Sequence, residues 1–189
     1  MRPAMMVFPV VLLLASLTTA AEPGPAVELP RRMGPLQRVG DVRRYDTPDM
    51  GYSFRFEAQS ILADVYFYDE GQQDLGTGKL DDRTARHFRD VEEAIAHFAK
   101  EGRYRDVVRR DKGKIKFKIG DRKLPAHYAE FEYTHADRPG RSVSIAVLTT
   151  WRDQYVKVRF TFSADREEEG QDAFDAFLAD LGKALGEAR

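Results

Sequence analysis

Hydrophobic and polar residues alternate one by one along several short segments of this chain. In residues 51–57 the alternation places three aromatic side chains on one face, which indicates a half-buried strand. Residues 61–68 are denser in apolar side chains and are typical of a central strand. A short strand over residues 43–45 is expected before them. Alternation also predicts strands over 114–119, 126–134 and 155–162, and two further strands are expected over 104–109 and 142–151.

The last predicted strand also predicts which side chains meet the core. Its four even-numbered apolar residues between 156 and 162 are expected to face inward. Lys157, Arg159 and Thr161 alternate with them and are expected to face out. The strand therefore predicts one buried face and one polar face of the sheet.

Two other segments repeat apolar residues at helical spacing. The first begins at Asp81 or Asp82, either of which can cap a helix, and runs to about Glu101. Gly102 follows as a natural stop, because glycine is the residue most often found just after a helix. The second segment, residues 167–185, has acidic residues near its start, where the helix dipole favours negative charge.

The order of these elements predicts an α+β domain. Consecutive strands joined by short turns favour a mostly antiparallel sheet, and the two amphipathic helices must pack their apolar stripes against it. A short strand, a strand that begins Gly51-Tyr52-Ser53-Phe54, one helix, a meander and a terminal helix follow one another over residues 42–185. This order resembles the PsbP/Mog1-like domains. The resemblance implies a non-catalytic binding or assembly module, often exported, and carries over no functional residue.

The N-terminus has the composition of an export signal. Residues 1–21 run from a positive start through an apolar stretch to small residues, so a signal peptide cleaved after Ala20 or Ala21 is expected. The apolar stretch is short for the alternative, an uncleaved membrane anchor. Residues 22–40 are rich in proline and are expected to form a spacer before a single α+β domain over 41–189. The mature protein is thus predicted to be periplasmic or secreted, with no transmembrane span.

Composition narrows the possible chemistry. The chain has 189 residues, 42% of them hydrophobic and 32% charged, which suits one globular domain. Its net charge of −1 gives no overall field that would select nucleic acid or an anionic membrane. It contains no cysteine, which excludes disulfides, thiolate nucleophiles, cysteine-ligated zinc and iron–sulfur clusters.

No motif predicts a catalytic, cofactor or metal site. Gly76-Thr77-Gly78-Lys79 fails as a phosphate loop, because Gln73 and Leu80 occupy positions that the motif reserves for other residues. Gly140 to Ser144 lacks the closing glycine of a nucleophile elbow. An acidic cluster before the first helix lacks the alternating pattern of a calcium loop, and it consists of Asp69, Glu70, Asp74, Asp81 and Asp82. We therefore expect no cofactor and no bound metal.

The most distinctive local feature is basic. Residues 103–123 contain ten lysines or arginines against three aspartates. Four of the lysines alternate and should line one face of a strand, namely Lys112, Lys114, Lys116 and Lys118. They form either a docking surface for an anionic partner or a charged edge that discourages aggregation. Nucleic acid is not expected, because Phe117 points to the opposite face and leaves no aromatic platform among the lysines.

Trp151 and the function as a whole remain open between alternatives. Trp151 is either an exposed aromatic anchor for a partner or a cap on the core at the end of the sheet. The leading hypothesis is an exported, non-catalytic module that binds an envelope protein or an anionic component. The first alternative is a small-molecule or lipid carrier with a pocket between sheet and helices, and the second is an enzyme with a dispersed site.

Overall fold

The structure, a computed structural model, describes residues 27–188. The expected signal peptide over residues 1–21 and the first part of the expected spacer lie outside the described residues. Within 27–188, no helix is both long and apolar enough to cross a membrane.

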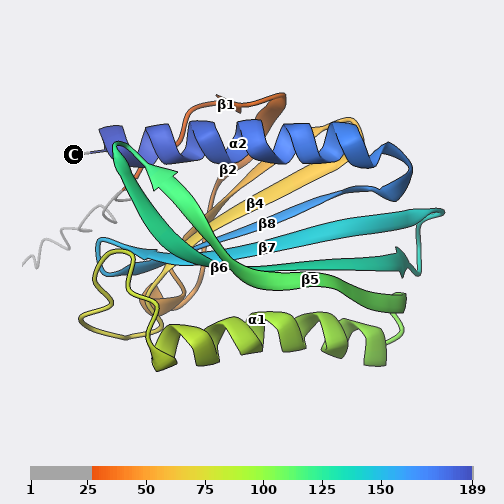
Figure 1. Cartoon of the computed structure of the whole chain (residues 1–189), viewed down its shortest axis with the longest axis horizontal. Coiled ribbons are helices and arrows are strands. Elements are labelled where there is room, and N and C mark those ends of the chain that lie inside the picture. Colours follow the sequence, from red (N-terminus) through yellow and green to blue (C-terminus); the bar gives the residue numbers. More distant parts are fainter. Residues whose placement is uncertain (1–26, 189) are drawn as a thin grey trace, which may run out of the picture.

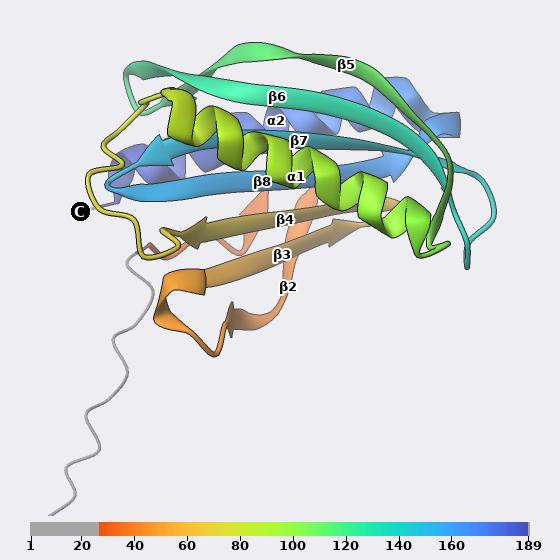
Figure 2. The same ribbon diagram turned by 90° about the horizontal axis from the view of Figure 1, so that it is seen from below.

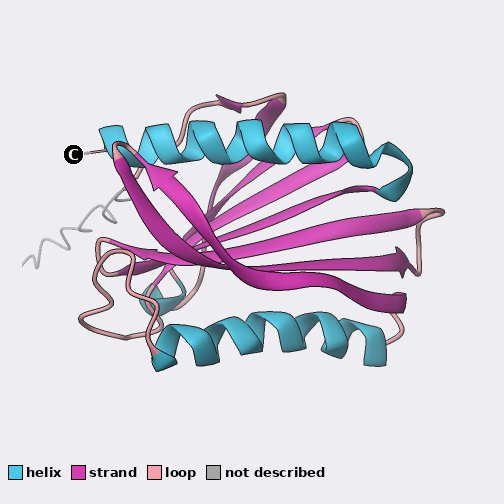
Figure 3. Ribbon diagram, viewed as in Figure 1, coloured by secondary structure: helices cyan, strands magenta, loops and turns pink. Residues whose placement is uncertain are grey.

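Eight strands form one antiparallel sheet in the order β1-β2-β3-β4-β8-β7-β6-β5 (Figures 1 and 3). The strands are β1 (Arg32–Met33), β2 (Leu36–Arg44), β3 (Tyr52–Ala58), β4 (Ile61–Tyr68), β5 (Tyr104–Ile119), β6 (Arg122–His135), β7 (Arg141–Trp151) and β8 (Gln154–Ser163). Two helices cover opposite faces of this twisted sheet, as Figure 1 shows. The predicted fold class, α+β with an antiparallel sheet and two amphipathic helices, is confirmed.

The C-terminal helix α2 (Glu167–Glu187) covers the larger of two cores. Phe177 of α2 is fully buried and meets the rings of Phe56 and Phe160, with ring centres 5.4 and 5.6 Å apart. Gly182 lets the same helix approach the backbone of β5, because a Cβ there would lie 1.8 Å from the carbonyl oxygen of Lys118. This close approach holds α2 against the outer strand of the sheet.

The first helix, α1 (Asp82–Lys100), covers the other face and a smaller core. Asp81 caps it as predicted, since its side chain accepts from the backbone N–H groups of Arg83 and Thr84. Phe88 and Ile95 are its buried apolar side chains. The helix packs on β5, β6 and β7 and runs obliquely across the sheet in Figure 2. Its position leaves the neighbouring surface of β4 and β8 only partly covered.

The presence of α1 on the second face corrects the prediction for β8. The even-numbered apolar residues do face the α2 core, and Val158 and Phe160 are buried there. Lys157 and Arg159, which we expected to face out, lie instead in the layer between the sheet and α1, where they line a pocket with residues of that helix. The two-residue period separates the faces of a strand, but it does not reveal that a helix covers the second face.

Strand β5 is continuous where the sequence predicts two strands. It runs from Tyr104 to Ile119 and has two register shifts. The shift between Arg109 and Asp111 falls at the predicted break, and the shift between Arg105 and Val108 lies within the first predicted strand. Asp106, within the latter shift, adopts a positive φ of 53°. A β-bulge inserts a residue without ending the strand, so alternation is lost locally while the pairing with β6 continues.

The ordered domain starts earlier than residue 41, the start that the composition predicts. Residues 32–33 and 36–44 already form strands β1 and β2. Four apolar side chains of this N-terminal part are buried in the core under α2, namely Val27, Leu29, Met33 and Leu36. Pro35 lies in the turn between β1 and β2 beside Gly34, whose φ of +53° favours glycine. Proline is tolerated here because it occupies a turn rather than a central strand.

Candidate functional site

The four predicted lysines lie on β5, which is an edge strand of the sheet, and all four are exposed. Lys112 pairs in register with Ala129 of β6, and Ala129 belongs to the core under α1. Because directly opposed residues of antiparallel strands point to the same side, the lysines project on the α1 side of the sheet. Phe117 is buried on the other side, as the alternation predicts.

Only one of these lysines has a carboxylate partner in the described part of the chain. The Nζ atom of Lys112 lies 2.6 Å from an oxygen of Glu92 on α1. Lys114, Lys116 and Lys118 form no ion pair within 4.0 Å among residues 27–188. We call these three residues, with Lys123, the basic edge.

Lys123 was not singled out by the sequence, although a signal for it exists. The hairpin between β5 and β6 has a two-residue loop, so Lys118 pairs directly with Lys123. The glycine at position 120, with a φ of +56°, is the residue that such a turn favours. Lys123 is exposed and has no ion pair among the described residues, so it extends the same positive surface.

The first half of β5 is basic but neutralised. Arg110 contacts three carboxylates, with N–O distances of 3.2 Å to Glu130, 3.6 Å to Glu132 and 2.8 Å to Glu167. Arg109 lies 3.4 Å from Glu92. Arg103 lies 3.4 Å from Glu101, whereas Arg105 forms no ion pair within 4.0 Å among residues 27–188. The run of ten basic residues therefore divides into a mostly paired N-terminal part and a largely unpaired C-terminal part. The uncompensated charge is concentrated at the end of β5.

Trp151 belongs to the core and offers no exposed aromatic surface. Its side chain is only 5% exposed and packs in the core under α2. The guanidinium group of Arg152 lies 4.4 Å from the centre of its ring and covers it further. The interpretation as an exposed anchor is therefore corrected, and the alternative, a cap on the core at the end of β7, describes its position.

Two histidines, His127 on β6 and His87 on α1, have largely buried side chains. His127 of β6 pairs in register with Lys114, is 9% exposed and stacks on Phe88 at 5.2 Å. Burial lowers the pKa of His127 and the positive charges of Lys114 and Lys112 lower it further. His87 of α1 lies 2.6 Å from the hydroxyl of Tyr68, and burial lowers its pKa as well, against the opposing effect of Glu70.

These two shifts predict that the protein loses stability on acidification. Both folded-state pKa values lie below the ordinary 6.5, so the unfolded chain takes up protons first as the pH falls through that value. The free energy of unfolding should therefore decrease below about pH 6.5 until the lowered pKa values are passed. Urea unfolding of the His127→Gln variant should show a smaller decrease than the parent. His97→Gln, at an exposed site on α1, is the control, and equal slopes for parent and His127→Gln would contradict the prediction.

The backbone N–H groups of the glycine loop before α1, residues 76–79, donate hydrogen bonds to the β7–β8 hairpin. The backbone N–H of Gly76 donates to Asp153, that of Gly78 to the carbonyl of Thr150, and that of Lys79 to the Thr150 hydroxyl, at 2.7 to 2.9 Å. Donors engaged in this way are not available to a phosphate group. The acidic cluster before α1 does not form a metal site, because no group of three potential metal ligands converges anywhere in residues 27–188.

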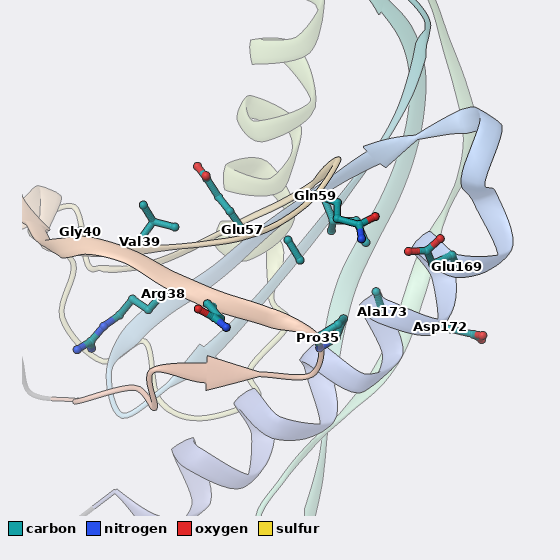
Figure 4. Close-up of a pocket in the computed structure, with 12 residues that line it drawn as sticks. Pro35, Arg38, Val39, Gly40, Glu57, Gln59, Glu169, Asp172 and Ala173 are labelled. Atoms are coloured by element: carbon teal, nitrogen blue, oxygen red, sulfur yellow. The ribbon is translucent and has the colours of Figure 1, made fainter.

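A large open cleft lies at the opposite end of the sheet from β5, beside β2. It has a volume of about 820 Å³ between β2, the β3–β4 turn and the start of α2, and Figure 4 shows its lining residues. Arg38 stands on one side and Glu169 and Asp172 on the other, so the charges are of mixed sign. Arg38 already donates to the carbonyl of Leu29 at 3.1 Å. Within residues 27–188, the lining of the cleft therefore offers no convergent set of charged groups of one sign.

Comparison with known proteins finds a structural likeness at low sequence identity. No protein-family model and no curated protein matches the chain. Among solved structures, the chain is similar to the cyanobacterial PsbP (CyanoP) of Synechocystis sp. PCC 6803, with 16% identity and a TM-score of 0.45 over 87% of this chain and 96% of the other. The resemblance to PsbP-like domains that the element order predicts is thus found again. At this level of similarity it transfers no function.

Proposed function

We propose that the protein is exported and works outside the cytoplasm as a non-catalytic binding module. In this proposal it docks onto an acidic surface of an envelope protein through the basic edge. The observation that supports this proposal is the uncompensated charge of Lys114, Lys116 and Lys118 on an exposed edge strand, beside Lys112, which is paired with Glu92. Positive side chains without local carboxylates attract a partner of opposite charge and orient its approach.

The same lysines also discourage the addition of another strand at the edge of β5. A purely protective role requires only charge, so glutamate would serve it equally well. A docking role requires positive charge. Reversal of the charge therefore separates the two roles.

We expect the triple variant Lys114→Glu, Lys116→Glu, Lys118→Glu to lose at least about ten-fold in affinity for its envelope partner, because attraction becomes repulsion. Affinity of the parent should also fall strongly between about 0.01 M and about 1 M ionic strength, where the Debye length shortens from about 30 Å to about 3 Å. Both quantities are measured by titrating the mature protein against membranes and soluble envelope fractions.

The matched control reverses three charges elsewhere. Arg86 and Lys100 on α1 and Lys183 on α2 are exposed and form no ion pair within the described residues. Their replacement by Glu changes the net charge equally and should leave the affinity close to that of the parent. Equal loss in both triple variants, or a parent affinity indifferent to salt, would contradict docking through the basic edge.

A further inference from the structure

A groove lies between α1 and the surface of β4 and β8 that this helix only partly covers. Its inner chamber has a volume of about 250 Å³ and its outer chamber about 290 Å³. The two chambers share Tyr66, Val91, Ala94 and Lys157 in their walls. These volumes lie near the lower limit for ligand pockets, which begin at about 300 Å³, so the groove suits a small molecule.

Two positively charged side chains of β8 form part of the inner chamber without a carboxylate partner. Lys157 and Arg159 make no ion pair within 4.0 Å among the described residues. Arg159 donates to neutral hydroxyl groups, at 2.8 Å to Tyr104 and 3.4 Å to Tyr133. The Nζ atom of Lys157 lies over the ring of Tyr66, 4.3 Å from its centre.

The two carboxylates whose charges act on Lys157, Asp64 and Glu70, form no ion pair with it within 4.0 Å. Asp64 pairs in register with Arg159, but both of its oxygens accept from Arg55, at 2.9 and 3.2 Å. Glu70 lies 3.3 Å from the Nδ1 atom of His87. A partly buried charge is costly without an opposite charge, and here two like charges share one face of one strand. Burial and the charge of Arg159 accordingly lower the pKa of Lys157.

The two chambers differ in charge and so define a direction for a ligand. Among the described residues, no carboxylate lines the inner chamber, and Ser144 adds a hydroxyl beside the two cations. The outer chamber contains Glu70 and Asp90 at its wall, with apolar surface from Met50. A negative group is therefore favoured inside and disfavoured at the mouth. The body of the ligand would lie along Tyr66 and Val91, which face both chambers.

We propose that this groove binds a small organic carboxylate, with the carboxylate at Lys157 and Arg159 and its apolar body directed along α1 toward the outer chamber. The site is separate from the basic edge, so either proposal stands if the other fails. Charge-assisted hydrogen bonds from a lysine and an arginine are the strongest that a carboxylate accepts, and apolar burial supplies the remaining affinity.

The test measures binding of octanoate to the mature protein by calorimetry and by amide shifts in NMR spectra. Octanamide, which has the same body without the charge, is the matched ligand. We expect octanoate to bind at least about ten-fold more tightly than octanamide and to shift resonances of β8 and α1. Equal affinity for the two, or no binding of octanoate, would overturn the proposal.

Variants locate the site. Ala94 lines both chambers but is exposed on α1, so the substitution Ala94→Trp should retain the fold. The indole ring should occupy the groove and abolish octanoate binding. Lys157→Met should also weaken octanoate binding at least about ten-fold, yet raise the urea midpoint, because it replaces an uncompensated charge by an apolar chain. A lowered midpoint with unchanged octanoate affinity would show that Lys157 is only structural and would overturn the assignment.

The triple glutamate variant serves as a control that separates octanoate binding in the groove from docking through the basic edge. The triple glutamate variant of the basic edge should bind octanoate with the affinity of the parent, because none of its three substituted residues lines either chamber. Loss of octanoate binding in that variant, with retention in Lys157→Met, would place the carboxylate on β5 and overturn the groove.

Discussion

Gly182→Ala should destabilise the protein by about 3 kcal/mol or more, although alanine in place of glycine inside a helix ordinarily stabilises by about 1 kcal/mol. The reversal of sign follows from the packing of α2 on β5. A Cβ at position 182 would lie 1.8 Å from the carbonyl oxygen of Lys118, which is backbone and has no rotamer to change. The helix would have to move away from the strand, and the hydrogen bond from the N–H of Gly120 to the carbonyl of Gly182, 3.0 Å long, would be broken.

Urea unfolding of Gly182→Ala beside Gly113→Ala provides the measurement. Gly113 lies on the same strand that α2 approaches, and a Cβ there meets nothing within 4 Å, so its replacement should change stability little. A loss below about 1 kcal/mol for Gly182→Ala would mean that α2 tolerates a methyl group at this contact, contrary to the packing described.

Phe177→Ala should cost about 3–5 kcal/mol, the usual range for removal of a fully buried phenylalanine. Its side chain is 0% exposed and fills the centre of the core under α2, between Phe56 and Phe160. Truncation leaves a cavity between rigid rings on the sheet and the helix, where little relaxation is possible. Chemical denaturation followed by circular dichroism measures the loss.

The matched truncation on α1, Phe98→Ala, should have a much smaller effect on the free energy of unfolding than Phe177→Ala. Phe98 of α1 is only partly buried and borders the inner chamber of the groove, so Phe98→Ala should cost about 1 kcal/mol. Equal costs for the two truncations would imply that α1 is packed as tightly as α2. That result would be incompatible with an open groove beneath α1.

Local patterns were sufficient to predict both helices and most of the strands, but not β1 or the first part of β2. The alternation in residues 51–57 and 126–134, the cap at Asp81 and the stripe of α2 each depend on neighbours within a few residues. The exposure of Lys114, Lys116 and Lys118 followed from the same alternation, because Phe117 is buried between two of them. Patterns of this range are fixed by the geometry of helix and strand.

The remaining features depend on which elements meet in space. Arg159 alternates with apolar residues and shares its face of β8 with Lys157 and Thr161, a pattern typical of a solvent-facing residue. Only the position of α1 places Arg159 beside a groove. Trp151 could not be assigned for the same reason, because the core beneath α2 decides its burial. Residues 27–40 have the composition of a spacer, but Met33 and Leu36 bury side chains against a helix about 140 residues later. No local pattern reports such contacts.

A cross-linking experiment in intact cells tests most directly whether the exported protein docks through the basic edge. The chain contains no cysteine, so Lys116→Cys and Lys183→Cys each provide one thiol on exposed surface, the first on β5 and the second on α2. A thiol-directed photo-cross-linker that does not cross the cytoplasmic membrane should modify both variants. It should then capture an acidic envelope protein from position 116 and none from position 183. No modification of either thiol would contradict export, and the same product from both positions would contradict docking at the basic edge.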